Sequence, residues 1–207
     1  MPRPKSYQRH DILQSCMSVF WRQGFAATSM RELELATGLS AGSLYHEFGS
    51  KEALFAEALE HYAVHVIETR IQHYLQRDHA VFTGIKEFML SACQPHTADR
   101  INACLLVNTA AELGQTKSNI GAIVKAGFRR IDRAIQAALK HAQDIGELAK
   151  DTQVATFASQ LAVTLPGLIL AARNGSSPQY LATVVDAVLH SQTWLTTDQH
   201  YQENKND

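Results

Sequence analysis

The chain has 207 residues, 45% of them hydrophobic, which suffices for a buried core in one large domain or two small ones. Its formal net charge of −1 gives no general attraction for nucleic acid. Basic residues nevertheless cluster at the N-terminus, where Arg3, Lys5 and Arg9 have no acidic neighbour among the first ten residues. Residues 1–6 are therefore expected to form an extended arm that reaches a minor groove or a phosphate, or else a frayed terminus.

The three cysteines, Cys16, Cys93 and Cys104, are an odd number, and their spacings match no disulfide or metal-binding framework. This usage predicts a reducing, cytoplasmic compartment. The polar N-terminus is unlike a signal peptide, and the longest apolar run, residues 161–172, is too short to cross a bilayer. We therefore expect no membrane partner.

The first helix is predicted over residues 7–23. Ile12, Cys16 and Phe20 recur on one helical face, and Gly24 follows the pattern. Cys16 lies on this apolar stripe, so it is interpreted as a core residue rather than a reactive thiol.

Capping signals then predict two short helices joined by a tight turn. Ser29 can cap the first, and Glu32 stands three residues later, as in a capping box. Gly38 is placed to end this helix, and Ser40 can cap a second helix over residues 41–48. This is the pattern of a helix-turn-helix, whose second helix enters the DNA major groove. An ordinary pair of packed helices is the alternative.

The second helix has distinct faces. Leu44 and Phe48, four residues apart, share the side expected to be buried, and Glu47 lies at its edge. The outward side begins with small residues, which let the backbone approach DNA, and ends with hydrogen-bond donors for phosphate. Together with the helix N-termini and a basic residue, this side gives the candidate DNA-binding residues Thr28, Ser29, Ser40, Gly42, Ser43, Tyr45, His46 and Lys51.

The segments GFAATSM at 24–30, LSAGSLYHEF at 39–48 and SKEALF at 50–55 resemble the DNA-binding domain of the TetR family of one-component repressors. The resemblance covers residues 8–60. It implies a three-helix DNA-binding domain, a helical ligand-binding domain and a homodimer. Many members carry His or another neutral residue where this chain has Glu47, so no phosphate contact is expected from that position.

A long helix over residues 51–77 is predicted to connect the DNA-binding domain to the rest of the chain. His61 and His65 on it have a spacing that can bind metal, but no third ligand lies nearby in sequence. We therefore predict no metal site and no cofactor.

The remaining pattern is helical, without strand periodicity. Helices are predicted at 80–93, 101–112, 117–143, 151–173 and 178–196. The predicted fold is all-α, with a helix-turn-helix DNA-binding domain at 1–50, a helical ligand-binding and dimerisation domain at 51–197 and a disordered tail at 198–207.

The last two predicted helices each carry an apolar stripe, and the first has a second apolar side at Val163 and Leu170. Such a helix needs more than one covering partner. The resemblance implies a four-helix dimer bundle built from these helices; an intramolecular hairpin is the alternative. The interface candidates are Phe157, Leu161, Leu165, Leu168, Leu181, Val184, Val185 and Val188.

Effector-binding candidates lie on the helices of the second domain: Met89, Cys104, Leu106, Asn108, Phe128 and Thr164. Cys104 stands near a predicted helix N-terminus, with Arg100 four residues earlier, and such neighbours lower a thiol pKa. Electrophiles and oxidants are among the signals that the resemblance implies, so Cys104 is a candidate sensor. A buried structural thiol is the favoured alternative.

No GxSxG elbow, P-loop, HExxH motif or Gly-rich dinucleotide turn is present, so no enzyme is predicted. The predicted function is a ligand-responsive transcriptional regulator: a repressor that binds a palindromic double-stranded operator as a dimer and is released by a small-molecule effector. A helical enzyme or binding module with an incidental helix-turn-helix is the alternative.

Overall fold

The computed structural model describes residues 8–94, 104–114 and 119–195. Within these ranges the fold is all-α, as predicted. An isolated β-bridge joins Leu148 and Trp194. The chain forms two compact units. The first unit comprises residues 1–67 and 104–127, and the second comprises 68–103 and 128–207. The predicted arm at 1–6 and tail at 198–207 lie outside the described residues.

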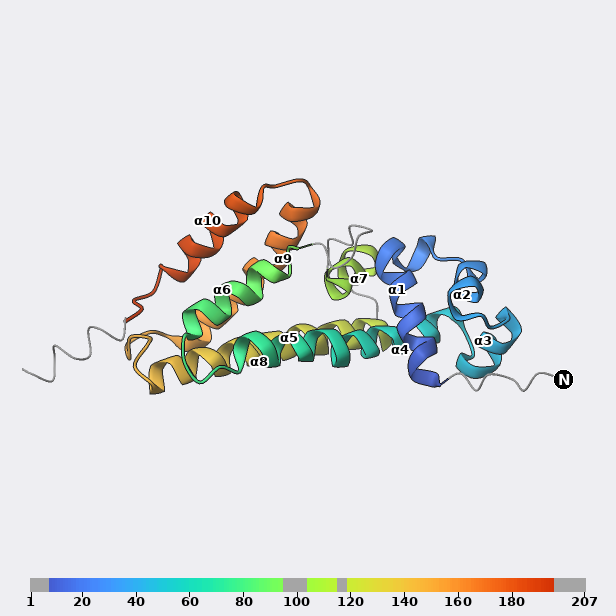
Figure 1. Cartoon of the computed structure of the whole chain (residues 1–207), viewed down its shortest axis with the longest axis horizontal. Helices are drawn as coiled ribbons and strands as arrows, with labels where there is room; N and C mark the ends of the chain where they lie inside the picture. The colour runs from blue at the N-terminus through green and yellow to red at the C-terminus, as the bar shows by residue number, and fades with distance from the viewer. Residues whose placement is uncertain (1–7, 95–103, 115–118, 196–207) are drawn as a thin grey trace, which may run out of the picture. The chain divides into compact units, whose positions relative to one another are not determined.

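The first unit begins with the helices of the predicted helix-turn-helix region, drawn in blue to cyan in Figure 1. They are α1 (Arg9–Ala27), α2 (Met30–Thr37), α3 (Ala41–Phe48) and α4 (Lys51–Tyr62).

Local capping sets both ends of α2 and the start of α3, as the sequence predicted. The Ser29 hydroxyl accepts a hydrogen bond from the Glu32 backbone N–H, and the Glu32 carboxylate accepts one from the Ser29 N–H. Gly38 ends α2 with φ 70°, and Ser40 caps α3 through the Ser43 N–H. Each cap satisfies backbone groups that the helix itself leaves without partners.

Aromatic and aliphatic side chains from all four helices form the core of the first unit. Phe20 of α1 meets Phe55 of α4 edge to face, with ring centroids 4.8 Å apart. Cys16 is buried beside them, which confirms its position on the apolar face of α1. Leu44 and Phe48 of α3 are also buried, as predicted, and each such side chain contributes roughly 1.5–3 kcal/mol through burial. Because Leu44 and Phe48 are buried, the opposite side of α3 faces outward.

The long helix predicted over 51–77 is interrupted. After α4 the chain forms a π-helical turn, η1 (Ala63–Ile67), before α5 (Glu68–Leu75). π-turns insert an extra residue into a helix and occur often at functional sites.

Two later segments complete the first unit: α7 (Leu105–Leu113) and the beginning of α8 (Asn119–Asp144). Helix α7 packs on α1 and α4. The first unit therefore extends beyond the predicted boundary at residue 50, because α7 comes back to these helices from a distant part of the sequence.

The second unit contains α5, the remainder of α8, α6 (Val81–Ser91), α9 (Val154–Arg173) and α10 (Pro178–Leu189). The Glu147 carboxylate accepts hydrogen bonds from the N–H groups of Ala80 and Val81, so it caps α6 in place of a local residue. Helix α10 ends before the predicted residue 196. Trp194 folds back there, and its indole N–H donates to the Leu189 carbonyl oxygen at 2.9 Å.

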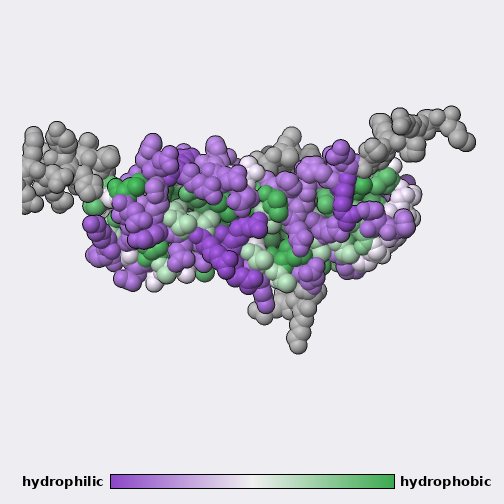
Figure 2. All heavy atoms as spheres, turned by 90° about the horizontal axis from the view of Figure 1, so that it is seen from below, coloured by the Kyte–Doolittle hydropathy of each residue, from purple (hydrophilic) through white to green (hydrophobic). Residues whose placement is uncertain are grey.

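Helix α9 is long and apolar enough by composition to cross a membrane, although the apolar run at 161–172 alone is not. Of the apolar 18-residue window within α9, 33% is buried inside the chain. A core helix that is covered by two partners is likewise apolar on several sides. On the face of the molecule drawn in Figure 2, hydrophobic residues form separate patches among hydrophilic ones.

Candidate nucleic-acid interface

The outward face of α3 is exposed and carries small and hydrogen-bonding residues. The exposed residues are Gly42, Ser43, Tyr45, His46 and Glu47. A Cβ added at Gly42 would meet only the Ser40 hydroxyl, at 3.9 Å, so the backbone at the start of α3 is uncovered. Tyr45 and His46 follow one turn later with polar tips that can donate to phosphate oxygens.

The hydroxyls at the helix starts are engaged within the protein. Ser40 accepts from the Ser43 N–H at 3.2 Å, and the two hydroxyls are 3.0 Å apart. The Ser29 hydroxyl donates to Glu32 at 2.8 Å. Hydrogen bonds from the Ser29 backbone N–H and hydroxyl lower the pKa of Glu32, so the capping carboxylate stays ionised. Ser29, Ser40 and Ser43 therefore hold the helix starts in shape.

Thr28 differs from its predicted role. Its side chain is buried, and its hydroxyl donates to the Gly24 carbonyl oxygen at 2.6 Å. Its side chain is thus directed into the protein and is not available to a phosphate. Ser29 caps this helix start, as the sequence predicted.

Lys51 stands at the first position of α4, just after the Ser50 cap. Its ammonium lies 4.6 Å from the centroid of the Phe25 ring, a cation–π geometry. The ring restrains a half-buried cation at a helix N-terminus, where partial positive charge also favours an anion.

Arg9 makes contacts beside α3 that pattern reasoning missed. Its guanidinium pairs with Glu47 of α3 and, at 2.7 Å, with Glu57 of α4, and it lies 4.7 Å from the Phe48 ring centroid. Glu47 was expected at the buried edge of α3; it is exposed, and this pair compensates its charge. This basic residue at the first position of α1 was visible in the sequence, but its two acidic partners were not.

The effector-binding candidates fall in both units. Phe128 lines a hollow of about 570 Å³ between α8 and α9, whereas Thr164 lines a different one. Met89 is fully buried in the second unit, and Cys104 and Leu106 are buried in the first, near half-buried Asn108.

The interface candidates on α9 and α10 differ in how far they are buried. Most of them are buried within the single chain: Phe157, Leu161, Leu165, Leu168, Leu181 and Val185. Val184 and Val188 are half-buried. The apolar stripe that is most regular in sequence packs inward, and the second side of α9 is the exposed one.

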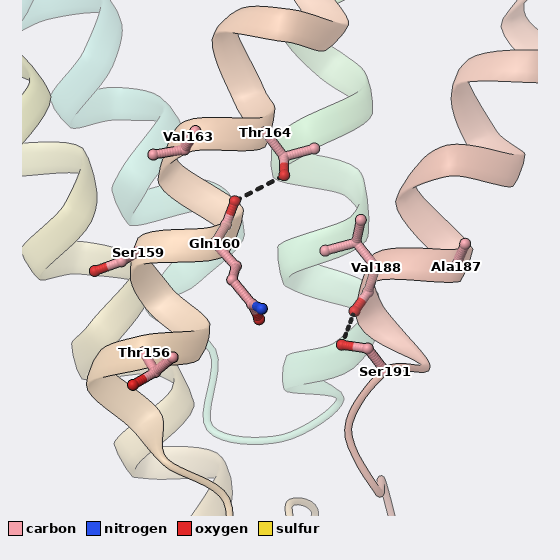
Figure 3. A pocket seen from close by; sticks show the side chains of 8 residues that line it. All are labelled: Thr156, Ser159, Gln160, Val163, Thr164, Ala187, Val188 and Ser191. Atoms are coloured by element: carbon pink, nitrogen blue, oxygen red, sulfur yellow. Dashed lines mark hydrogen bonds between the residues drawn. The ribbon is translucent and has the colours of Figure 1, made fainter.

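This exposed side includes Val163, which is 77% exposed, and Leu170, which is 48% exposed. A groove of about 830 Å³ runs along it between α9 and α10. Figure 3 shows its lining side chains: Thr156, Ser159, Gln160, Val163, Thr164, Ala187, Val188 and Ser191. Small, weakly polar and apolar residues of this kind suit close helix packing, so this face, which includes the predicted residue Val188, is an interface candidate.

Two family models match the chain. The model described as bacterial regulatory proteins, tetR family, matches residues 12–58, which contain α2 and α3. The model described as tetracyclin repressor-like, C-terminal domain, matches residues 88–188.

Curated relatives are similar over nearly their whole length. The HTH-type transcriptional repressor ComR of Escherichia coli (strain K12) is 27% identical, over 90% of this chain and 90% of the relative. The HTH-type transcriptional repressor AcnR of Corynebacterium efficiens is 26% identical, over 87% of this chain and 89% of the relative.

Solved structures agree with the fold. A cysteine mutant of the TetR family transcriptional regulator CifR, complexed with 26-base-pair double-strand operator DNA, has a TM-score of 0.76 and 28% identity, covering 92% of this chain and 100% of that chain. The reduced form of NemR from E. coli has a TM-score of 0.74 at 22% identity, covering 90% and 97%, and supports the fold alone.

Proposed function

The chain belongs to the TetR family of bacterial regulatory proteins, and from this premise we propose that it represses transcription by binding a palindromic operator as a homodimer until a small-molecule effector releases it. The observation that carries the proposal is the exposed outward face of α3, with bare backbone at Gly42 and donors at Tyr45 and His46. The relatives are transcriptional regulators, so the alternative of a helical enzyme is not favoured. Such a regulator acts where bacterial DNA lies, in the cytoplasm.

Docking requires two copies of α3. In a symmetric dimer the two recognition helices enter successive major grooves when their centres lie about 34–36 Å apart, and the half-sites then repeat with the symmetry of the protein. Gly42 and Ser43 would approach base edges, while Tyr45, His46 and Lys51 would hold phosphates. The pair of Arg9 with Glu47 reduces the repulsion between that carboxylate and DNA.

A contact inside the first unit supplies a route for the effector's signal. The Glu112 carboxylate of α7 accepts hydrogen bonds from the backbone N–H groups of Phe25 and Ala26, at 3.0 and 2.5 Å. These residues follow Gly24, where α1 is broken by φ 83°, and lead directly to the N-terminal cap of α2. An effector that displaces α7 would therefore move the start of the helix-turn-helix.

Because coupling free energy is shared, DNA would weaken effector binding by the same factor by which effector weakens DNA binding. A gel-shift assay with the promoter region upstream of the chain's own gene tests the proposal. We expect retardation of that fragment and not of a shuffled one of equal length. Equal binding to both fragments, or to neither, contradicts a sequence-specific repressor.

Lys51→Ala should weaken binding to specific and shuffled DNA alike. A phosphate contact carries no sequence information, so the ratio of the two affinities should stay constant. The slope of log affinity against log salt should fall by about one unit for each lost contact. Salt titration by fluorescence anisotropy measures both quantities. An unchanged slope would remove Lys51 from the interface.

Thiol reagents should release the operator no more from wild type than from Cys104→Ser. Cys104 is buried at the N-cap of α7, and Arg100 lies outside the described residues. Burial raises the pKa of Cys16 to about 12 and that of Cys93 to about 11, so both are protonated and slow to react at neutral pH.

Operator release after treatment with an alkylating reagent is the measurement, with Cys93→Ser as the control. Loss of the response in Cys104→Ser alone would make Cys104 the sensor. For Cys16 and Cys93, alkylation of the folded protein should accelerate only as the pH approaches these raised pKa values.

A further inference from the structure

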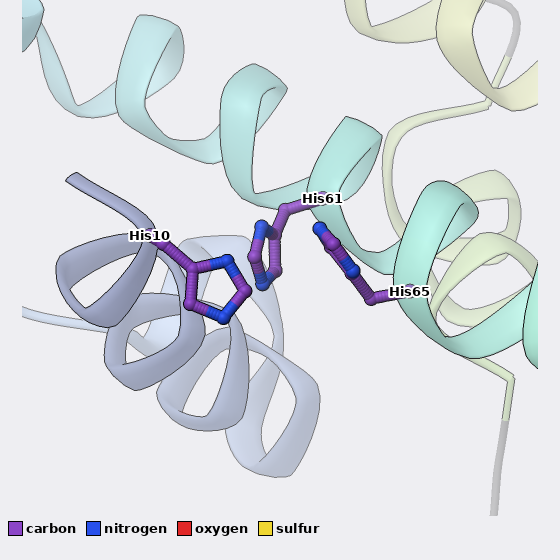
Figure 4. A group of neighbouring side chains, drawn as sticks. All are labelled: His10, His61 and His65. Atoms are coloured by element: carbon purple, nitrogen blue, oxygen red, sulfur yellow. The ribbon is translucent and has the colours of Figure 1, made fainter. Parts of the chain in front are cut away.

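Three histidines from distant parts of the sequence converge in the first unit. His10 lies in the first turn of α1, His61 near the end of α4 and His65 inside η1. Their ligand nitrogens lie within 4.8 Å of one another. Figure 4 shows the three rings gathered between α1 and the α4–η1 segment. The expectation that His61 and His65 lack a third ligand is thereby corrected, because the fold supplies one from α1.

The three rings are packed closely together. The ring centroids are 4.8 Å apart for His10 and His61, 5.1 Å for His10 and His65, and 4.2 Å for His61 and His65. His61 is buried, whereas the other two are exposed. Burial, and then the neighbouring His65 and His10, lower the pKa of His61. A neutral imidazole is the form that binds a metal ion.

A fourth residue orients the buried ring. The Gln14 amide oxygen of α1 lies 3.1 Å from Nε2 of His61. An amide oxygen can only accept a hydrogen bond, so Nε2 carries the proton and Nδ1 keeps its lone pair. Metal-binding histidines generally donate their second ring N–H to such an oxygen, which fixes the tautomer and the ring orientation.

We propose that His10, His61 and His65 bind a divalent transition-metal ion of the Zn²⁺ class, with water or an added ligand at a fourth position. Imidazole suits this class, whereas Mg²⁺ and Ca²⁺ prefer oxygen ligands. Tetrahedral coordination with bonds of 2.0–2.1 Å needs nitrogens about 3.4 Å apart. Rotation of the two exposed side chains, His10 and His65, can close this gap while the buried ring stays in place.

The ion would join the start of α1 to the α4–η1 segment. His10 directly follows Arg9, which pairs with Glu47 of the recognition helix α3. The site would therefore restrain the segment that orients α3. This inference goes beyond the proposed repressor function, and metal binding can be measured without DNA.

Titration of the metal-free full-length protein with Co²⁺, followed by displacement with Zn²⁺, tests the site. Wild type should give the visible absorption of tetrahedral Co²⁺ at one ion per chain. His65→Gln should bind more than about 100-fold more weakly, since loss of a mere outer partner already costs about 10–100-fold. Gln14→Leu, which removes that outer partner, should fall in the 10–100-fold range.

His79→Gln is the matched control, because His79 is an exposed histidine outside the cluster. It should bind Co²⁺ as wild type does. Zn²⁺ should also raise the melting temperature of wild type and His79→Gln but not of His65→Gln, because a ligand that binds the folded state stabilises it. Both variants replace exposed residues, so folding is retained. Equal Co²⁺ affinity in wild type and His65→Gln, or no binding by wild type, would overturn the proposal.

Discussion

Gly42→Glu should abolish operator binding and leave the first unit folded. An added Cβ at Gly42 meets only the Ser40 hydroxyl, at an ordinary contact distance of 3.9 Å. The position is the second of α3, where an acidic side chain suits the helix dipole. The change should therefore cost no stability. On DNA, however, the same carboxylate would stand where α3 approaches the groove.

The expected loss of operator affinity is at least about 1,000-fold, because each like-charge contact across an interface costs several kcal/mol and a dimer carries two copies. Gln179→Glu is the matched control: it adds the same charge at the second, exposed position of α10. Anisotropy measures affinity, and thermal melting followed by circular dichroism measures stability. If Gly42→Glu retained operator binding at normal stability, α3 would not be the recognition helix.

Val163→Asp should give folded monomers that do not bind the operator. Val163 is 77% exposed on the outward side of α9, in the groove that Figure 3 shows. In an isologous interface both copies of the new carboxylate enter the same interface, so two like charges lose water together. A monomer reaches only one half-site.

Val185→Asp should behave differently, since Val185 is completely buried within one chain. An unpaired carboxylate there should lower the melting temperature or unfold the second unit, whatever the oligomeric state. Val64→Asp, at a valine of η1 that is 51% exposed, is the control and should remain dimeric.

Sedimentation velocity reports the oligomeric state of all three variants, and far-UV circular dichroism reports their folding. A wild-type protein that sediments as a monomer at micromolar concentration would refute the interface. A dimeric Val163→Asp would place the interface elsewhere.

The local architecture of the helix-turn-helix could be predicted from the sequence. The capping box of Ser29 and Glu32, the left-handed Gly38 and the Ser40 cap involve residues within a few positions of one another, so the sequence alone determines them. The inward face of α3 followed from the four-residue spacing of Leu44 and Phe48. Helix existence beyond α4 was also predictable, because periodicity is a property of neighbouring residues.

What the tertiary structure decided depends on contacts between distant residues. Helix α9 has two apolar sides, and periodicity cannot say which one its own chain covers; packing buried Leu161 and left Val163 exposed. The same holds for polar groups. Glu112 reaches the end of α1 from α7, and His10 completes a set with His61 and His65 only because α1 packs against α4. Sequence spacing limits which residues can meet within one helix, whereas the packing of separate helices decides which side chains meet across the fold.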